Sequence, residues 1–176
     1  ETILDVSISY LENANGSKSE YLGSYKNGSD AAYVYSYDGN GNITSIVHGN
    51  ERTTYVYDGP NQLIRVNDSA SNTTTIYTYD QGGNIISKIE YNYTSGRLPS
   101  NTRNTYTYSY DSEWKDLLVS YNGEAITYDE IGNPLSYCGY DMTWNGRQLH
   151  NMYNAEKNLT FTYDENGMRV GKDAVS

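Results

Sequence analysis

The sequence is poor in the residues that usually build a dry protein core. Leu, Ile, Val and Phe together number 30 of 176 residues, 17% of the chain, and Phe occurs once. Compositions below about 20% in these four residues are typical of disordered chains. Charged residues, however, make up only 19% of the chain, which argues against a coil swollen by charge repulsion. If the chain folds, it must bury another kind of apolar surface.

Cysteine, basic residues and long apolar runs are also scarce. Cys138 is the only cysteine, so no internal disulfide forms. Lys and Arg number 12 against 22 Asp and Glu, a net charge of −10. Because nucleic acids and anionic membranes are bound through basic residues, we expect neither as a partner. No run approaches the roughly 18 apolar residues of a membrane span, so we expect no membrane insertion.

The sequence also lacks a clustered set of metal ligands and a signal peptide. Neither His48 nor His150 has a His or Cys partner at the spacing of a zinc site, which needs about four ligands. We therefore expect no metal and no cofactor. The chain opens without Met and without a basic-then-apolar signal pattern, and we expect it to be a piece of a longer protein.

Tyrosine is abundant where the aliphatic residues are few. The chain has 21 Tyr. Each ring adds a large apolar surface and a hydroxyl that needs a hydrogen-bond partner or water. We therefore expect a broad sheet face lined with phenol groups rather than a deep aliphatic core.

The tyrosines recur in a repeated pattern, Tyr-x-Tyr-Asp or a close variant, with a working period near 20 residues. A Gly or Asn follows three residues after most of the Asp residues. The copies are Tyr35, Tyr37, Asp38 and Gly41; Tyr55, Tyr57, Asp58 and Asn61; Tyr77, Tyr79, Asp80 and Gly83; Tyr108, Tyr110 and Asp111, with a disturbed turn; Tyr128, Asp129 and Gly132; and Tyr163, Asp164 and Gly167. A weaker copy lies at Thr143–Leu149.

Each part of the pattern has a physical reading. Tyr-x-Tyr places both rings on one face of a β-strand. The Asp side chain accepts a hydrogen bond from the backbone two residues on, which starts a turn. Gly and Asn tolerate the left-handed φ that such turns need. The pattern therefore predicts β-hairpins that close through a type I turn and a bulge.

The connections between copies also predict turns. Asn122-Gly123 and Asn145-Gly146 are the strongest two-residue hairpin signal, and no apolar stripe of helical period occurs. We therefore predict an all-β fold of consecutive antiparallel β-hairpins forming a continuous twisted meander sheet, with 12 to 16 strands. One long loop is expected at Asn92–Thr105. The unguarded outer strands, expected near Val6–Tyr10 and Leu159–Tyr163, favour edge-to-edge self-association.

Three functional readings of these residues compete with the structural one. Asp38-Gly39-Asn40-Gly41-Asn42 resembles the start of a calcium loop but lacks the later Gly and Glu, so we favour a turn. Asp129-Glu130 and Asp164-Glu165 lie in predicted turns, which disfavours a glycosidase pair, and no catalytic residues are predicted. The tyrosine stripes fit cross-strand packing or a sugar-stacking face. Trp114 and Trp144 are the best single candidates for a glycan platform.

The motif resembles that of the RHS/YD-repeat family, Tyr-x-Tyr-Asp-x-x-Gly-Asn followed by Leu or Ile. The copies at Asp38, Asp80 and Asp129 are similar to it, and the stretch from Met142 to Arg169 resembles the late repeats of Gram-positive members. The resemblance covers residues 33–172 of a predicted single domain, 1–176, whose residues 1–32 are more diverged. The Asp-Pro-x-Gly type motif of the family's autoproteolytic core has no match here.

The resemblance implies a function without enzymatic activity. In that family the repeats form a sheet that spirals into a hollow shell, often around a C-terminal toxin. It implies a shell segment of a secreted or cell-surface bacterial protein, whose partners are neighbouring repeats and the C-terminal domain of the parent protein. The alternative is a carbohydrate-binding adhesion module that uses its Tyr and Trp faces.

Overall fold

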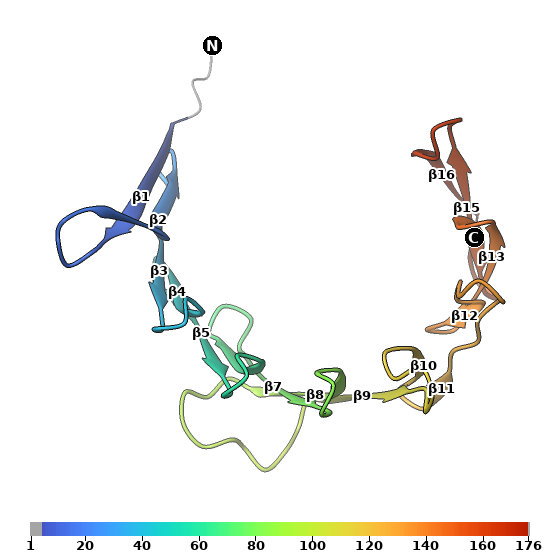
Figure 1. Ribbon diagram of the computed structural model, residues 1–176, viewed down its shortest axis with the longest axis horizontal. Coiled ribbons are helices and arrows are strands. Elements are labelled where there is room, and N and C mark those ends of the chain that lie inside the picture. Colours follow the sequence, from blue (N-terminus) through green and yellow to red (C-terminus); the bar gives the residue numbers. More distant parts are fainter. Residues whose placement is uncertain (1–4, 176) are drawn as a thin grey trace. The chain divides into compact units, whose positions relative to one another are not determined.

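The computed structural model describes residues 5–175, and these form β-strands and no helix (Figure 1). The strands are β1 Val6–Glu12, β2 Lys18–Asn27, β3 Tyr33–Tyr37, β4 Ile43–His48, β5 Glu51–Tyr57, β6 Leu63–Asp68, β7 Thr73–Tyr79, β8 Ile85–Asn92, β9 Asn104–Tyr110, β10 Leu118–Tyr121, β11 Glu124–Ala125, β12 Ser136–Tyr137, β13 Tyr140–Asn145, β14 Gln148–Tyr153, β15 Asn158–Tyr163 and β16 Arg169–Val175. No helix of these residues is long and apolar enough to cross a membrane.

The strands follow the chain order, as the hairpin pattern predicts. One sheet has the order β1 to β11 and a second has the order β12 to β16. The chain divides into two compact units, Glu1–Thr105 and Tyr106–Ser176, which are described separately. The prediction of consecutive antiparallel hairpins is therefore confirmed.

The regular ladder is interrupted within the second unit, at the copy that contains Tyr128 and Asp129. Between β11 and β12 the pairing is reduced to a single bridge, Tyr128 to Pro134. Pro134 stands where other copies carry Ile43 or Leu63. Because proline has no backbone N–H, it cannot continue the ladder of hydrogen bonds.

The predicted turns form as expected. The residue three places after the Asp has positive φ in all five copies: 87° at Gly41, 67° at Asn61, 91° at Gly83, 86° at Gly132 and 78° at Gly167. Register shifts lie beside these turns, for example between Ser36 and Tyr37 and between Val56 and Tyr57. A type I turn followed by a bulge accounts for both observations.

A further copy of the turn lies in the diverged first residues. The Asn13 amide donates to the Ser17 carbonyl at 2.8 Å, and the Gly16 amide donates to the Asn13 carbonyl at 2.9 Å. Asp38 makes the same two contacts, with Asn42 and Gly41. Asn13 therefore takes the place of the motif Asp in the β1–β2 hairpin.

Each tyrosine pair lies on one face of its strand. In the first unit Tyr35 is opposite Ile46, Tyr55 is opposite Val66, and Tyr77 is opposite Lys88. We call this the tyrosine face. The opposite face is mixed: Ser36 is opposite Ser45, Val34 is opposite Val47, and the Thr78 and Ser87 hydroxyls are 2.6 Å apart.

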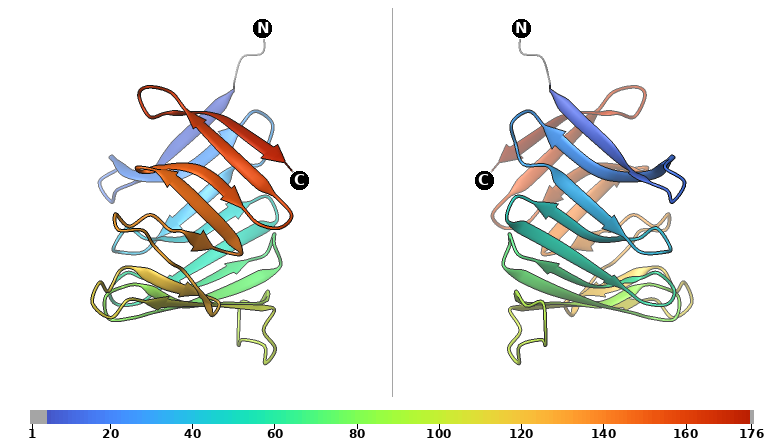
Figure 2. Two further views of the ribbon diagram at one scale, coloured as in Figure 1. Left: turned by 90° about the vertical axis from the view of Figure 1, so that its right-hand side faces the viewer. Right: turned by 90° about the vertical axis from the view of Figure 1, so that its left-hand side faces the viewer.

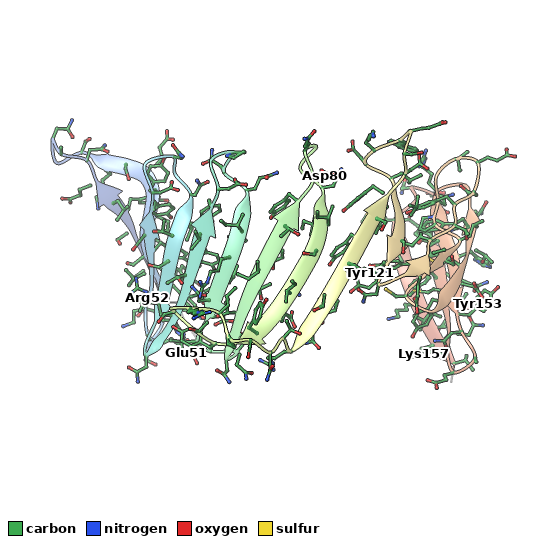
Figure 3. The ribbon with its side chains drawn as sticks, turned by 90° about the horizontal axis from the view of Figure 1, so that it is seen from below. Glu51, Arg52, Asp80, Tyr121, Tyr153 and Lys157 are labelled. Carbon is green, nitrogen blue, oxygen red and sulfur yellow. The ribbon has the colours of Figure 1, made fainter. Side chains whose placement is uncertain are left out.

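The sheet of the first unit is a single layer (Figure 2). Asp80 lies at one end of the strands, among the motif turns, whereas Glu51 and Arg52 lie at the opposite end of the strands (Figure 3). The chain exposes 12,090 Å², whereas a compact monomer of 19.8 kDa exposes about 8,600 Å². Only Ile126, Met142 and Phe161 are buried apolar residues among those described, and all three belong to the second unit.

The long loop lies where it was predicted, between β8 and β9, and it is tied to the face opposite the tyrosine face. Arg65 Nη2 donates to the carbonyls of Thr94 and Gly96 at 2.8 and 2.9 Å. The Thr94 amide donates to the hydroxyl of Thr74, which has no exposed surface. Asn67, 6% exposed, links Arg65, Thr74 and Thr54. This buried polar network fastens residues 93–103 over β5 to β7.

Two details of the prediction are wrong. The last strand is not Leu159–Tyr163, because that segment pairs on its far side with β16. The loop of the β13–β14 hairpin is Gly146-Arg147 rather than Asn145-Gly146, because Asn145 still pairs with Gln148. At Asn122-Gly123, by contrast, both residues have positive φ, as the Asn-Gly signal predicts.

Candidate functional site

The motif aspartates serve as hydrogen-bond acceptors within their own turns. Asp38 Oδ1 accepts from the amides of Asn40 and Asn42, each at 2.9 Å. Asp80 and Asp129 make the equivalent contacts with residues two and four places later. Carboxylates used in this way stabilise a turn, and no cluster of three or more His, Cys, Asp or Glu suited to a metal occurs among residues 5–175.

The asparagine four residues after the Asp completes the turn, a role that the sequence analysis missed. Asn42 Nδ2 donates to Asp38 Oδ2 at 3.0 Å, and Asn84 does the same to Asp80. Asn133 Nδ2 donates to both Asp129 Oδ2 and the Gly146 carbonyl, each at 2.8 Å. The recurrence of Asn at this offset was a signal that could have found it.

These contacts lower the pKa of the motif carboxyls. The pKa is lowered mainly by the hydrogen bond from the Asn42 side chain at Asp38 and from the Asn84 side chain at Asp80. At Asp129 the main cause is the hydrogen bond from the backbone N–H of Asn133. Hydrogen bonds donated to the charged form favour that form. A carboxyl whose pKa is lowered by folding stabilises the fold above its unfolded pKa, and this contribution is lost as the pH falls through the folded value.

We therefore expect the melting temperature to decrease when the pH is lowered below about 3.8, the ordinary pKa of Asp, because the motif aspartates then take up protons. Asp80→Asn should lower the melting temperature at pH 6. It should also make the decrease in melting temperature between pH 4 and pH 2 smaller than in the parent chain. The exposed Glu130→Gln is the control and should leave both unchanged. Calorimetric melting at half-unit pH steps measures the effect. A profile of Asp80→Asn parallel to that of the parent chain would contradict it.

In four of the copies, the tyrosine directly before the motif Asp donates its hydroxyl to a backbone carbonyl of the preceding return strand. Tyr37 donates to Leu22 at 3.0 Å and Tyr57 donates to Ile43 at 3.0 Å. Tyr79 donates to Leu63 at 2.7 Å, and Tyr128 donates to Leu118 at 2.6 Å. We call this contact the aromatic clasp. It joins one hairpin to the next, and burial raises the pKa of all four hydroxyls.

The clasp follows a fixed register. Ser45 pairs with Thr54, the acceptor Ile43 lies two residues before Ser45, and the donor Tyr57 lies three residues after Thr54. The same offsets relate Tyr37 to the pair Ser24–Val34, Tyr79 to the pair Arg65–Ile76, and Tyr128 to the pair Ser120–Ala125. The strand pairing between the two hairpins ends here, and the ring hydroxyl takes the place of a backbone donor. The clasp thus satisfies a carbonyl that would otherwise need water.

Trp144 makes the same contact. Its indole N–H donates to the Pro134 carbonyl at 2.7 Å, with the same offsets from the Ser136–Asp141 pair. Trp144 is half-buried and replaces the motif tyrosine, which weakens the prediction of a glycan platform there. Trp114, in the disturbed turn after Asp111, is 60% exposed. The two tryptophans therefore have different surroundings.

The clasp gives a direct prediction for a pair of neighbouring tyrosines. Tyr79→Phe should lower the free energy of unfolding by about 1 kcal/mol, because a hydrogen bond is lost while the ring stays. Tyr77→Phe is the matched control, since the Tyr77 hydroxyl has no hydrogen-bond partner among residues 5–175 and the ring is on the same strand. Urea unfolding of both variants measures the difference. Equal stability of the two variants would contradict the role of the clasp.

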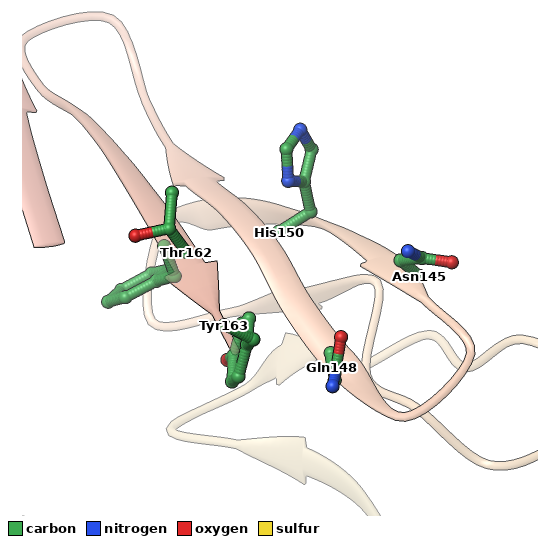
Figure 4. A pocket seen from close by; sticks show the side chains of 6 residues that line it. Asn145, Gln148, His150, Thr162 and Tyr163 are labelled. Carbon is green, nitrogen blue, oxygen red and sulfur yellow. The ribbon is translucent and has the colours of Figure 1, made fainter. Parts of the chain in front are cut away.

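The hollows of the second unit are small. One of about 230 Å³ is lined by Asn145, Gln148, His150, Phe161, Thr162 and Tyr163 (Figure 4). Another of about 270 Å³ lies beside β11 and β12 and includes the exposed Cys138. Ligand pockets usually measure about 300–1,000 Å³. The lining of the first hollow includes His150 but no Ser or Cys, and the lining of the second includes Ser136 and Cys138 but no His.

Comparison with known proteins finds similarity in structure alone. No family model matches the chain, and no curated protein matches it. A crystal structure of TcdB2-TccC3-Cdc42 matches 96% of this chain with a TM-score of 0.71 and 20% identity. A crystal structure of TcdB2-TccC3-TEV matches 95% with a TM-score of 0.67 and 19% identity. The chain spans about a tenth of the length of these proteins.

Proposed function

We propose that the chain is a wall segment of an RHS/YD-repeat shell, secreted or displayed on the surface of a bacterium, and that it has no enzymatic activity of its own. The observation that carries this proposal is the aromatic clasp between successive hairpins. It recurs at the same offsets at Tyr37, Tyr57, Tyr79, Tyr128 and Trp144, and it joins each of these hairpins to the one before it.

The single-layer sheet supports the same function. A sheet of one layer leaves the tyrosine face without a second layer of its own unit, and a conventional globular domain covers such a face with another element. In a shell wall, one face of the sheet is turned toward the enclosed space and the other face toward solvent. The fold shared with a tenth of the much longer TcdB2-TccC3 chains fits a segment of a larger assembly.

The alternative of a glycan-binding module has less support. Sugar binding by stacking needs rings that are open to solvent, and the second tyrosines are half-buried with their hydroxyls donated to backbone carbonyls. Trp114 is the exposed ring that could serve a sugar. Binding of the chain to a glycan array that is lost in Trp114→Ala would favour this alternative.

Electron microscopy of the parent protein tests the proposal. We expect residues 5–175 in the wall of a hollow shell, with the strands next to β1 and β16 supplied by adjacent repeats. A parent protein in which these residues form a separate domain, with both outer strands open to solvent, would overturn the proposal.

A further inference from the structure

The hollow of about 270 Å³ beside β11 and β12 lies where the ladder of the second unit is interrupted. The return strand β12 has two residues, whereas β6, the return strand of a regular copy, has six. β12 ends at Tyr137, and the turn at Cys138-Gly139 then leads into β13. Among residues 5–175, no strand pairing joins β11 to β12. The hollow therefore follows from the shortened return strand and is part of the fold.

The side chains at this copy of the motif are exchanged relative to a regular copy. In the β5–β6 hairpin, Tyr55 lies three residues before the motif Asp and is opposite Val66, eight residues after it. At the same offsets from Asp129 stand Ile126 and Tyr137. A smaller side chain thus occupies the place of the first motif tyrosine, and a ring occupies the place of the aliphatic partner. This exchange puts an aromatic ring at the border of the hollow.

Three tyrosines and a glutamate line the hollow from one face of the strands. Tyr121 is paired with Glu124 across the β10–β11 hairpin, and paired residues share a face. Tyr137 is paired in the same way with Tyr140 across the β12–β13 hairpin. The rings of Tyr121 and Tyr137 are tilted by 44° with their centroids 5.7 Å apart, which brings the two pairs to the same side. Ile126, 7% exposed, adds apolar lining.

The hollow also carries negative charge without a basic partner. Neither Glu124 nor Asp141, which lines the hollow as well, forms an ion pair among residues 5–175. The lining includes no Lys, Arg or His. Since the whole chain has a net charge of −10, the electrostatic potential at the hollow favours cations. Tyrosine rings attract a cation placed over their faces, so the rings and the carboxylates favour the same kind of ligand.

We propose that this hollow binds an alkylated ammonium group, of the kind that choline carries, with its methyl groups against the tyrosine rings and its charge beside Glu124. A quaternary ammonium has no N–H, so it needs no hydrogen-bond acceptors, whereas a primary ammonium is strongly hydrated and has three donors to satisfy. The hollow is smaller than the pocket of a drug-sized ligand and suits a small head group. This site goes beyond the proposed shell-wall function and does not depend on it.

Titration of the full chain with choline, followed by amide chemical shifts in nuclear magnetic resonance spectra, tests the proposal. We expect shifts that saturate and that are confined to residues near 124–126 and 136–141. The neutral analogue 3,3-dimethylbutanol has the shape of choline without its charge, and it should bind about tenfold more weakly or less. Butylammonium, a primary amine of similar size, should also bind more weakly than choline.

Two variants with matched controls test the lining residues. Tyr137→Leu should weaken choline binding about fivefold, the loss of one cation–π contact, whereas Tyr153→Leu, at a tyrosine of the same unit with similar exposure, should not. Glu124→Gln should weaken binding about threefold, because an exposed carboxylate is screened by water. Glu156→Gln, at an exposed glutamate outside the hollow, is its control.

Absence of choline binding, or equal affinity for choline and the neutral analogue, would overturn the inference. Tighter binding of butylammonium than of choline would contradict the assignment to an alkylated ammonium, and unchanged affinity in Tyr137→Leu would contradict the role of the rings. The comparison of the three small molecules uses the unaltered chain, so it decides the question even if a variant does not fold.

Discussion

Phe161→Ala should lower the free energy of unfolding of the second unit by about 3 kcal/mol. Phe161 is 6% exposed and is one of the few buried apolar side chains in the described chain. The Arg169 guanidinium lies over its ring, 5.6 Å from the centroid. Truncating a buried Phe removes both transfer free energy and packing, at a typical cost of about 3–5 kcal/mol. The lower end applies because a hollow already adjoins the ring.

Urea unfolding followed by tryptophan fluorescence measures this effect, since both Trp114 and Trp144 belong to the second unit. Thr162→Ala is the control, because Thr162 is exposed and points to the opposite face of β15. Phe161→Leu should cost roughly a third as much as Phe161→Ala. A loss below about 1 kcal/mol for Phe161→Ala would mean that Phe161 is not part of a core.

Gly41→Val should lower the free energy of unfolding by about 2–3 kcal/mol. The φ of Gly41 is 87°, a conformation that costs a β-branched residue about 1–3 kcal/mol. A Cβ at this position would also lie 2.6 Å from the Tyr21 hydroxyl, and the Tyr21 ring packs at a tilt against Tyr37 with ring centroids 4.9 Å apart. Displacing Tyr21 therefore disturbs the packing beside a clasp.

Gly39→Val is the matched control, because Gly39 lies in the same turn without positive φ and a Cβ there meets nothing within 4 Å. Gly41→Asn separates the two causes, since Asn tolerates the conformation, as Asn61 does, but still brings a Cβ against Tyr21. Thermal and urea melts of the three variants measure the differences. Equal stability of Gly39→Val and Gly41→Val would contradict the hairpin assignment.

The features that the sequence predicted are local ones. The turn at Asp38 depends on residues within four positions, and its positive φ favours Gly or Asn three residues after the Asp whatever the rest of the chain does. The shared face of Tyr35 and Tyr37 follows from strand geometry alone. The clasp could also have been predicted in part, because its offsets follow from the period of the repeat. That prediction would, however, require the position at which the strand pairing between neighbouring hairpins ends.

The features that the sequence did not predict depend on residues far apart in the chain. The network of Arg65, Asn67 and Thr74 reaches the loop through Thr94, 29 positions after Arg65. Nothing in the local pattern marks Arg65 as a buried anchor rather than a solvated charge. The reduced pairing at Pro134, by contrast, has a local cause, because a proline without a backbone N–H follows the turn of that copy.

The ordering of strands along the chain has a consequence for synthesis. Every strand pairs with neighbours that precede or follow it directly, so no early strand must wait for a distant one to leave the ribosome. Contacts of low sequence separation also shorten the search for the native pairing. Each clasp points backward, from a newly made tyrosine to a carbonyl already in place, as from Tyr57 to Ile43. The chain can therefore assemble in the direction in which it is translated, one hairpin serving as the template for the next.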